Sequence, residues 1–201
     1  MSWLSGLEWI AVILSAVSVY LSARENIWSW PTAIVSVAMY VFVFVEKGLY
    51  SDAGLQVFFA AISVYGWYEW LHGGEARSRL HVSRATRKAW LVSAGFAVAF
   101  WIVLGTLTSR LAGVSLPFLD AGLATLSVVA QIMMTRKILE NWILWIIVDI
   151  VYVPMYAYKH LYPTALLYAV FLVLAVTGLV SWRRSLSRDH AVVPHPAPTP
   201  A

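Results

Sequence analysis

Seven apolar stretches, separated by short polar joints, run through this sequence of 201 residues. They lie near residues 6–23, 28–45, 53–71, 89–109, 118–135, 141–158 and 163–182. A helix needs about 20 mainly apolar residues to cross the hydrocarbon core of a bilayer. Because 61% of the residues are hydrophobic and only 12% are charged, the composition argues strongly against a water-soluble enzyme. The sequence therefore predicts an all-α integral membrane protein with seven transmembrane helices.

The basic residues between these stretches predict the orientation of the chain. Alternate joints contain 11 of the 14 Lys and Arg residues, and the remaining joints contain only Lys47, Arg110 and Lys159. Cytoplasmic loops of membrane proteins collect Lys and Arg, so we expect the N-terminus outside the cell and the C-terminus in the cytoplasm. The basic loop 72–88 is then a topology signal, and no nucleic-acid partner is expected.

The sequence contains an internal repeat. Glu25-Asn26 and Trp30 recur as Glu140-Asn141 and Trp145, 115 residues later, and a longer series ending at Trp70 recurs 112 residues later and ends at Trp182. The change of offset predicts a three-residue deletion in the second copy. Three helices per copy, joined by one extra helix, give both copies the same orientation. Transporters built from parallel repeats bind their substrate between them.

This repeat predicts four parts of the chain. They are a first three-helix bundle over 1–71, a basic cytoplasmic loop and linker helix over 72–117, a second three-helix bundle over 118–182, and a disordered cytoplasmic tail over 183–201, whose end is rich in proline. Gly66 and Gly178 occupy matched positions, where we expect helices to approach closely.

The stretch 141–158 carries a polar and aromatic stripe. Its members fall within roughly 80° of a helix surface and are Asn141, Trp145, Asp149, Tyr152, Tyr156 and, just beyond, Lys159. A carboxylate in the middle of a span must face a wet cavity, find a partner or be protonated. Aromatic faces beside a carboxylate suit an uncharged or cationic ring-bearing ligand with hydroxyl groups. The alternative is that these side chains only hold the helices together.

Other polar positions extend this predicted site. Gln56 shares a helix face with Phe59 and Ser63, and Gln131 is a polar residue within the fifth stretch. Asn26 corresponds to Asn141, although either residue could instead cap a helix. The sequence has no cysteine, no phosphate-binding glycine loop and no metalloprotease or hydrolase motif, so we expect no enzymatic activity, cofactor or metal.

Three segments of the sequence resemble the PnuC family of bacterial vitamin transporters. They are ENIWSWPTAIVSV, GLYSDAGLQVFFAAISVYGWYEW and the segment that begins MMTRKILENWILW, and the resemblance covers about residues 20–182. It implies a SWEET-like fold with a 3+1+3 arrangement of helices, facilitated diffusion, trapping of the substrate by a cytoplasmic kinase, and a homotrimer. Through the family's motifs it also implies that Gln56, Asn141 and Trp145 contact the ligand.

We therefore expect a uniporter that imports nicotinamide riboside, for NAD biosynthesis, across the inner membrane of a bacterium. The alternatives are a carrier of thiamine, another vitamin or a nucleoside, and a membrane scaffold or sensor without transport. The second bundle is expected to supply most of the polar wall, because Ile34, Val37 and Val41 stand in the first copy where the second has Asp149, Tyr152 and Tyr156. The predicted binding residues are Asn26, Trp30, Gln56, Gln131, Asn141, Trp145, Asp149, Tyr152 and Tyr156.

Overall fold

The computed structural model describes residues 2–46, 50–110, 117–158, 160 and 162–192. These residues form seven α-helices and one short 3-10 turn, η1 (Glu75–Arg77). The helices are α1 (Ser2–Ala23), α2 (Ser29–Glu46), α3 (Tyr50–His72), α4 (Arg87–Thr108), α5 (Pro117–Thr135), α6 (Asn141–Tyr158) and α7 (Tyr162–Val192). Within the described ranges there is no β-strand, so the predicted all-α class is confirmed.

The lengths and compositions of the helices fit a bilayer. Six of the described helices are long and apolar enough to cross a membrane. The seventh, α3, has 23 residues but carries polar residues along much of its length, including Gln56 and Glu69. Each predicted apolar stretch overlaps one observed helix, and between consecutive stretches the helices end at the polar joints.

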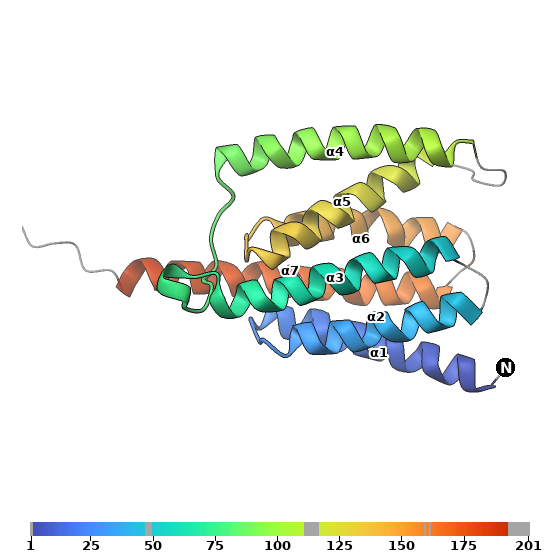
Figure 1. Ribbon diagram of the computed structural model, residues 1–201, viewed down its shortest axis with the longest axis horizontal. Coiled ribbons are helices and arrows are strands. Elements are labelled where there is room, and N and C mark those ends of the chain that lie inside the picture. Colours follow the sequence, from blue (N-terminus) through green and yellow to red (C-terminus); the bar gives the residue numbers. More distant parts are fainter. Residues whose placement is uncertain (1, 47–49, 111–116, 159, 161, 193–201) are drawn as a thin grey trace, which may run out of the picture.

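The helices form two bundles, and α4 lies outside them (Figure 1). In the first bundle α2 packs against α1 and α3, and in the second α6 packs against α5 and α7. The bundles meet along two seams, where α1 packs against α7 and α3 packs against α5. Helix α4 packs against α5, and an extended segment connects it to the end of α3 (Figure 1). This is the predicted 3+1+3 arrangement.

One constant offset relates the two bundles. Helices α1 and α5 end at Ala23 and Thr135, and α2 and α6 begin at Ser29 and Asn141, so both pairs of residues are 112 apart. The starts of α3 and α7 have the same separation. The predicted three-residue deletion is therefore wrong. The recurrence at an offset of 115 is a coincidence of sequence, since Asn26 lies in the turn before α2 whereas Asn141 is the first residue of α6.

Packing around two glycines confirms this offset. A Cβ atom at Gly66 would overlap the ring of Trp30, and a Cβ atom at Gly178 would overlap the ring of Trp142. Trp30 is therefore the counterpart of Trp142, not of Trp145 as the sequence comparison suggested. The expected close approach of helices at both glycines is confirmed.

Each of these tryptophans also meets a second tryptophan of its own bundle. The ring centroids of Trp30 and Trp70 are 5.3 Å apart with an interplanar angle of 90°. Those of Trp142 and Trp182 are 5.4 Å apart with an angle of 87°. The same edge-to-face packing, which is favourable for aromatic pairs, therefore stabilises both bundles.

The predicted tail begins later than expected. Helix α7 continues to Val192, so residues 183–192 are helical and not disordered. The segment after Gly178 contains no glycine or proline before Pro194, so nothing in it breaks the helix where it becomes polar. The remainder of the predicted tail, 193–201, lies outside the described residues.

Candidate functional site

A cavity of about 340 Å³ lies between the two bundles. Helices α1, α2 and α3 line one side, and α5, α6 and α7 line the other. Each of the eight lining residues from the second bundle has its counterpart, 112 residues earlier, in the lining from the first. The cavity is therefore centred on the axis that relates the two repeats. The eight pairs are Val19 and Gln131, Ser22 and Met134, Trp30 and Trp142, Ala33 and Trp145, Val37 and Asp149, Gln56 and Tyr168, Phe59 and Phe171, and Ser63 and Ala175.

Most of these pairs differ in chemistry, so the cavity has two unlike walls. Val37 faces the space on one side where Asp149 faces it on the other, and Ala33 is opposed by Trp145. Two aromatic pairs are nearly unchanged between the repeats, namely the tryptophans at 30 and 142 and the phenylalanines at 59 and 171. The protein has thus kept an aromatic frame and changed the polar groups within it, which lets the cavity bind an asymmetric ligand.

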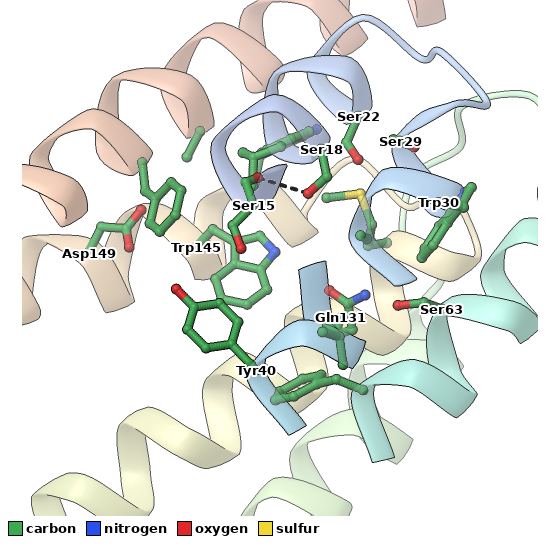
Figure 2. Close-up of a pocket in the computed structure, with 18 of the residues that line it drawn as sticks. Ser15, Ser18, Ser22, Ser29, Trp30, Tyr40, Ser63, Gln131, Trp145 and Asp149 are labelled. Atoms are coloured by element: carbon green, nitrogen blue, oxygen red, sulfur yellow. Dashed lines mark hydrogen bonds between the residues drawn. The ribbon is translucent and has the colours of Figure 1, made fainter. Parts of the chain in front are cut away.

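Asp149 and Trp145 point into the same open space (Figure 2). Asp149 is only 3% exposed, and its carboxylate forms no hydrogen bond or ion pair with any residue that the structure describes. A buried carboxylate without a partner costs several kcal/mol. The arrangement therefore favours a ligand that brings a positive charge or hydrogen-bond donors to Asp149.

Two amides complete the polar groups on the wall. Gln56 and Gln131 both line the cavity, and neither side chain has a hydrogen-bond partner within the described part of the chain. Figure 2 shows Gln131 and Tyr40 beside Trp145. Since an amide offers both donors and an acceptor, these residues are available to a ligand with hydroxyl or carboxamide groups.

A row of serines in α1 forms the opposite wall. Ser15, Ser18 and Ser22 line the cavity and follow one face of the helix with spacings of three and four residues. The Ser15 hydroxyl lies 2.8 Å from that of Ser36, which itself donates to the carbonyl of Ala11 at 2.8 Å. The prediction that the second bundle supplies most of the polar wall is therefore wrong. The prediction compared the two copies at an offset of 115 residues, whereas the structure relates them by 112, and it did not consider α1.

Four predicted site residues lie outside the cavity lining. Asn26 is exposed, and its Oδ1 accepts a hydrogen bond from the backbone N–H of Trp28 at 3.0 Å, which stabilises the turn before α2. Asn141 is fully buried, and its Nδ2 donates to the carbonyl of Ile138 at 2.6 Å. Neither asparagine therefore caps its helix in the way the alternative supposed, because the Oδ1 of Asn26 is bonded within the turn before α2 and the Oδ1 of Asn141 accepts no hydrogen bond from the described part of the chain.

Tyr152 and Tyr156 lie behind the wall. Their rings pack against Tyr168, with centroid distances of 4.7 Å and 5.2 Å, and it is Tyr168 that faces the cavity. The two tyrosines therefore support a lining residue from α7. The last member of the predicted stripe, Lys159, lies outside the described residues.

One end of the cavity is closed by contacts between the bundles. The Trp70 indole N–H donates across one seam to the carbonyl of Met134, and the Trp182 indole N–H donates across the other seam to the carbonyl of Ser22, both at 3.0 Å. The two donors are 112 residues apart, and so are the two acceptors, so the same hydrogen bond is made twice around the axis. These bonds hold the ends of α1 and α5 in place.

An ion pair lies at the same closed end. The Lys137 ammonium is 3.1 Å from a carboxylate oxygen of Glu25 and 4.6 Å from the centre of the Trp70 ring. The basic loop covers this turn, because the backbone of Ser83 is bonded to Lys137 and Leu139, and the N–H of Ala85 donates to Glu140. The basic end of the bundle is therefore sealed in this conformation.

Four buried polar atoms at the closed end have no hydrogen-bond partner in the described part of the protein. They are Ser29 Oγ, Trp30 Nε1, Asn141 Oδ1 and Trp142 Nε1. Ser29 corresponds to Asn141, and Trp30 to Trp142, so both repeats leave the same positions unpaired at the starts of α2 and α6. Such groups are costly unless water or a ligand satisfies them.

Sequence reasoning missed several lining residues. The serine row of α1 had a detectable signal, since Ser15, Ser18 and Ser22 repeat at helical spacing within an apolar stretch. Tyr168 could have been found by applying the offset of 112 to Gln56. Tyr40 had no comparable signal. The predicted residues Trp30, Gln56, Gln131, Trp145 and Asp149 do meet at one cavity.

Known proteins are similar to this chain in sequence and in fold. A family model described as nicotinamide mononucleotide transporter matches residues 5–184. The nicotinamide riboside transporter PnuC of Escherichia coli is 28% identical over 90% of this chain and 87% of that protein. The riboflavin/roseoflavin transporter RibM of Streptomyces davaonensis is 27% identical over 95% of this chain and 91% of that protein.

A solved structure has the same fold. The crystal structure of the vitamin B3 transporter PnuC matches with a TM-score of 0.71 at 24% sequence identity, over 92% of this chain and 83% of that chain. The matched proteins are transporters and not enzymes. The resemblance noted in the three sequence segments therefore extends to the whole helical part of the chain.

Proposed function

This chain belongs to the nicotinamide mononucleotide transporter family, and from that membership we propose that it imports nicotinamide riboside across a bacterial inner membrane by facilitated diffusion. One observation carries the choice of substrate: the Asp149 carboxylate faces the central cavity without a partner among the described residues. The pyridinium ring of nicotinamide riboside has a permanent positive charge, which would compensate the buried carboxylate.

The other lining groups match the rest of this ligand. The Trp145 indole offers a flat face beside Asp149, and a cationic ring over an indole is the most favourable cation–π pair. Gln56 and Gln131 are available to a carboxamide and to ribose hydroxyls. The serine row of α1 faces the second side of the ligand. Base, charge and sugar thus each have a complementary group on the wall.

The cavity favours the riboside over the mononucleotide. None of the described residues that line it is Arg, Lys or His, so a phosphate monoester would have no cation with which to pair. Its negative charges would also be repelled by Asp149. We therefore propose that the phosphorylated ligand is rejected, although the family description refers to the mononucleotide.

Riboflavin is the second candidate substrate, because one relative is a riboflavin transporter. The aromatic frame would suit its ring. However, riboflavin has a larger, uncharged three-ring system, and a volume of about 340 Å³ is near the lower limit of the roughly 300–1,000 Å³ typical of ligand pockets. Riboflavin would also leave Asp149 without a countercharge.

The proposed mechanism is alternating exposure of this one cavity to the two sides of the membrane. A uniporter can bring its substrate only to electrochemical equilibrium, so the proposal includes a cytoplasmic kinase whose phosphorylated product the cavity rejects and which thereby traps the imported substrate. We propose that the basic end faces the cytoplasm, with the N-terminus outside, because 11 of the 14 Lys and Arg residues lie in joints on that side. Assembly as a homotrimer is part of the same proposal and follows from the family resemblance.

Two measurements test this proposal. Calorimetry on the purified protein, with nicotinamide riboside, nicotinamide mononucleotide, thiamine and riboflavin, should give binding of the riboside and none of the mononucleotide. Proteoliposomes loaded with a riboside kinase and ATP should accumulate label from the riboside, and those without ATP should only equilibrate. Preference for riboflavin or thiamine would contradict the substrate. Absence of uptake for every vitamin would favour a scaffold or sensor.

A further inference from the structure

A second groove lies between α1 and α7, at the basic end of the bundle. It has a volume of about 630 Å³ and shares no lining residue with the central cavity. Three arginines line it, Arg24 from the turn directly after α1 and Arg184 and Arg188 from α7. Because Arg184 and Arg188 are one helical turn apart, they project from the same face of α7. Three like charges therefore converge on one groove.

The acidic residue within this groove is already engaged. Glu25 lines it, but its carboxylate is bonded to Lys137 at 3.1 Å. Across the residues that the structure describes, no carboxylate pairs with any of the three arginines. Arg24 instead lies against Tyr20, with its Nη2 3.2 Å from the phenol oxygen and its guanidinium carbon 5.6 Å from the ring centroid. Among the side chains that the structure describes, none compensates the positive charge of these three arginines.

The matched seam between α3 and α5 provides an internal comparison. The counterpart of Arg24 there is Arg136, which lies 3.9 Å from the carboxylate of Glu69 and 5.5 Å from the Tyr65 ring. The residue that corresponds to Glu69, 112 positions later, is Ser181, and it lines the α1–α7 groove. One seam thus carries its own anion, whereas in the other a small neutral residue leaves room for an external one.

We propose that this groove binds the headgroup of an anionic phospholipid. The guanidinium groups match a phosphate in charge and geometry. The groove continues along α7 past Val180 and Val176, which are 42% and 45% exposed and lie in the part of α7 that is apolar enough to span the membrane. A free phosphate would use only the basic end, whereas a phospholipid would also cover the valines. Basic pockets between transmembrane helices bind anionic headgroups in this way.

Lipid binding can be measured by native mass spectrometry on the purified full-length protein. The probe is phosphatidylglycerol, compared with phosphatidylcholine of the same acyl chains. We expect phosphatidylglycerol to bind preferentially, and a triple variant with Arg24→Gln, Arg184→Gln and Arg188→Gln to lose about 100-fold in affinity. The matched control is a triple variant with Arg77→Gln, Arg79→Gln and Arg84→Gln, which removes the same charge from the exposed basic loop and should keep wild-type affinity.

A second variant tests the site without removing an arginine. Ser181→Glu copies the carboxylate of Glu69 into the α1–α7 seam, where it should pair with Arg24 and weaken phosphatidylglycerol binding about tenfold. If the triple variant of the basic loop lost as much affinity for phosphatidylglycerol as the triple variant of the groove, the cause would be a general charge effect, and the proposal would be overturned. Equal binding of phosphatidylcholine would also overturn it. If millimolar inorganic phosphate displaced phosphatidylglycerol completely, the groove would be a site for a free anion, and the lipid proposal would be overturned.

Discussion

Glu25 and Lys137 occupy equivalent positions in the two repeats, and they form an ion pair with each other at 3.1 Å. Both follow the last turn of a helix, and both have a positive φ, 54° and 48°. Equivalent residues of two repeats can meet only at the axis that relates them. The pair therefore lies on the axis, between the two tryptophan–carbonyl hydrogen bonds of the closed end. In the proposed alternating mechanism, opening of this end would separate Glu25 from Lys137.

Reversal of one charge should disrupt the closed end. In a Lys137→Glu variant, two carboxylates face each other on the axis, and we expect riboside uptake to fall about tenfold, which corresponds to a coupling within the range of about 0.5–3 kcal/mol for contacting residues. The double variant Glu25→Lys with Lys137→Glu restores the opposite charges and should recover most of the uptake. Uptake into proteoliposomes measures both. If the double variant were as impaired as the single one, the ion pair would have no role in closure.

Removal of the Trp145 ring should abolish stacking on the ligand without unfolding the protein. Stacking on an aromatic side chain contributes about 1–3 kcal/mol, so Trp145→Ala should bind nicotinamide riboside about 10- to 100-fold more weakly by calorimetry. Trp28→Ala is the matched control, since Trp28 is 64% exposed and does not line the cavity. Normal riboside binding by Trp145→Ala would remove this residue from the site.

Neutralising Asp149 should change selectivity by charge. Nicotinamide riboside and its reduced, uncharged dihydropyridine form have nearly the same shape. The ratio of their affinities therefore measures how much the positive charge of the ligand contributes to binding. We expect wild-type protein to prefer the cation, and Asp149→Asn to reduce that preference about tenfold or more, as expected for a charge partly removed from water. Val37→Asn, at the counterpart position, serves as the control for adding an amide. An unchanged ratio in Asp149→Asn would argue against charge recognition by this carboxylate.

A methyl group at Gly178 should destabilise the second bundle. The added Cβ would overlap the Trp142 ring, which is 1% exposed and held between α6 and α7, so we expect a loss of about 1–3 kcal/mol in unfolding free energy. In Gly95→Ala the new methyl group meets no atom within 4 Å, and this control should be neutral or slightly stabilising. Thermal unfolding in detergent compares the two variants. Equal stability would mean that Trp142 can move aside.

The sequence predicted most of the fold correctly because membrane helices are specified locally. The joints 24–28 and 136–140 each contain three polar or charged residues, and the observed helices end directly before them and begin directly after them. The two-bundle arrangement was also predictable from the sequence, since Gly66 and Trp70 recur as Gly178 and Trp182. The tail was predicted less well, because composition marks where a helix leaves the membrane and not where it stops being helical.

The binding residues were only partly predictable, because periodicity identifies a helix face but not the direction in which that face points. Trp145 and Asp149 reach the cavity, whereas Tyr152 and Tyr156 on the same stripe pack against Tyr168. Asn141 lies at the start of the stripe and bonds to its own turn. Whether one member of a stripe meets a cavity depends on the neighbouring helix at that level.

Sequence alone thus determined the number of helices, the presence of two like-oriented copies and a carboxylate within a membrane span, since each follows from hydrophobicity and covalent order. Tertiary structure decided which residues are equivalent, which of them meet at the axis, and which polar groups remain unpaired beside a cavity. Those features depend on contacts between helices that are distant along the chain, such as Trp182 with Ser22 and Lys137 with Glu25.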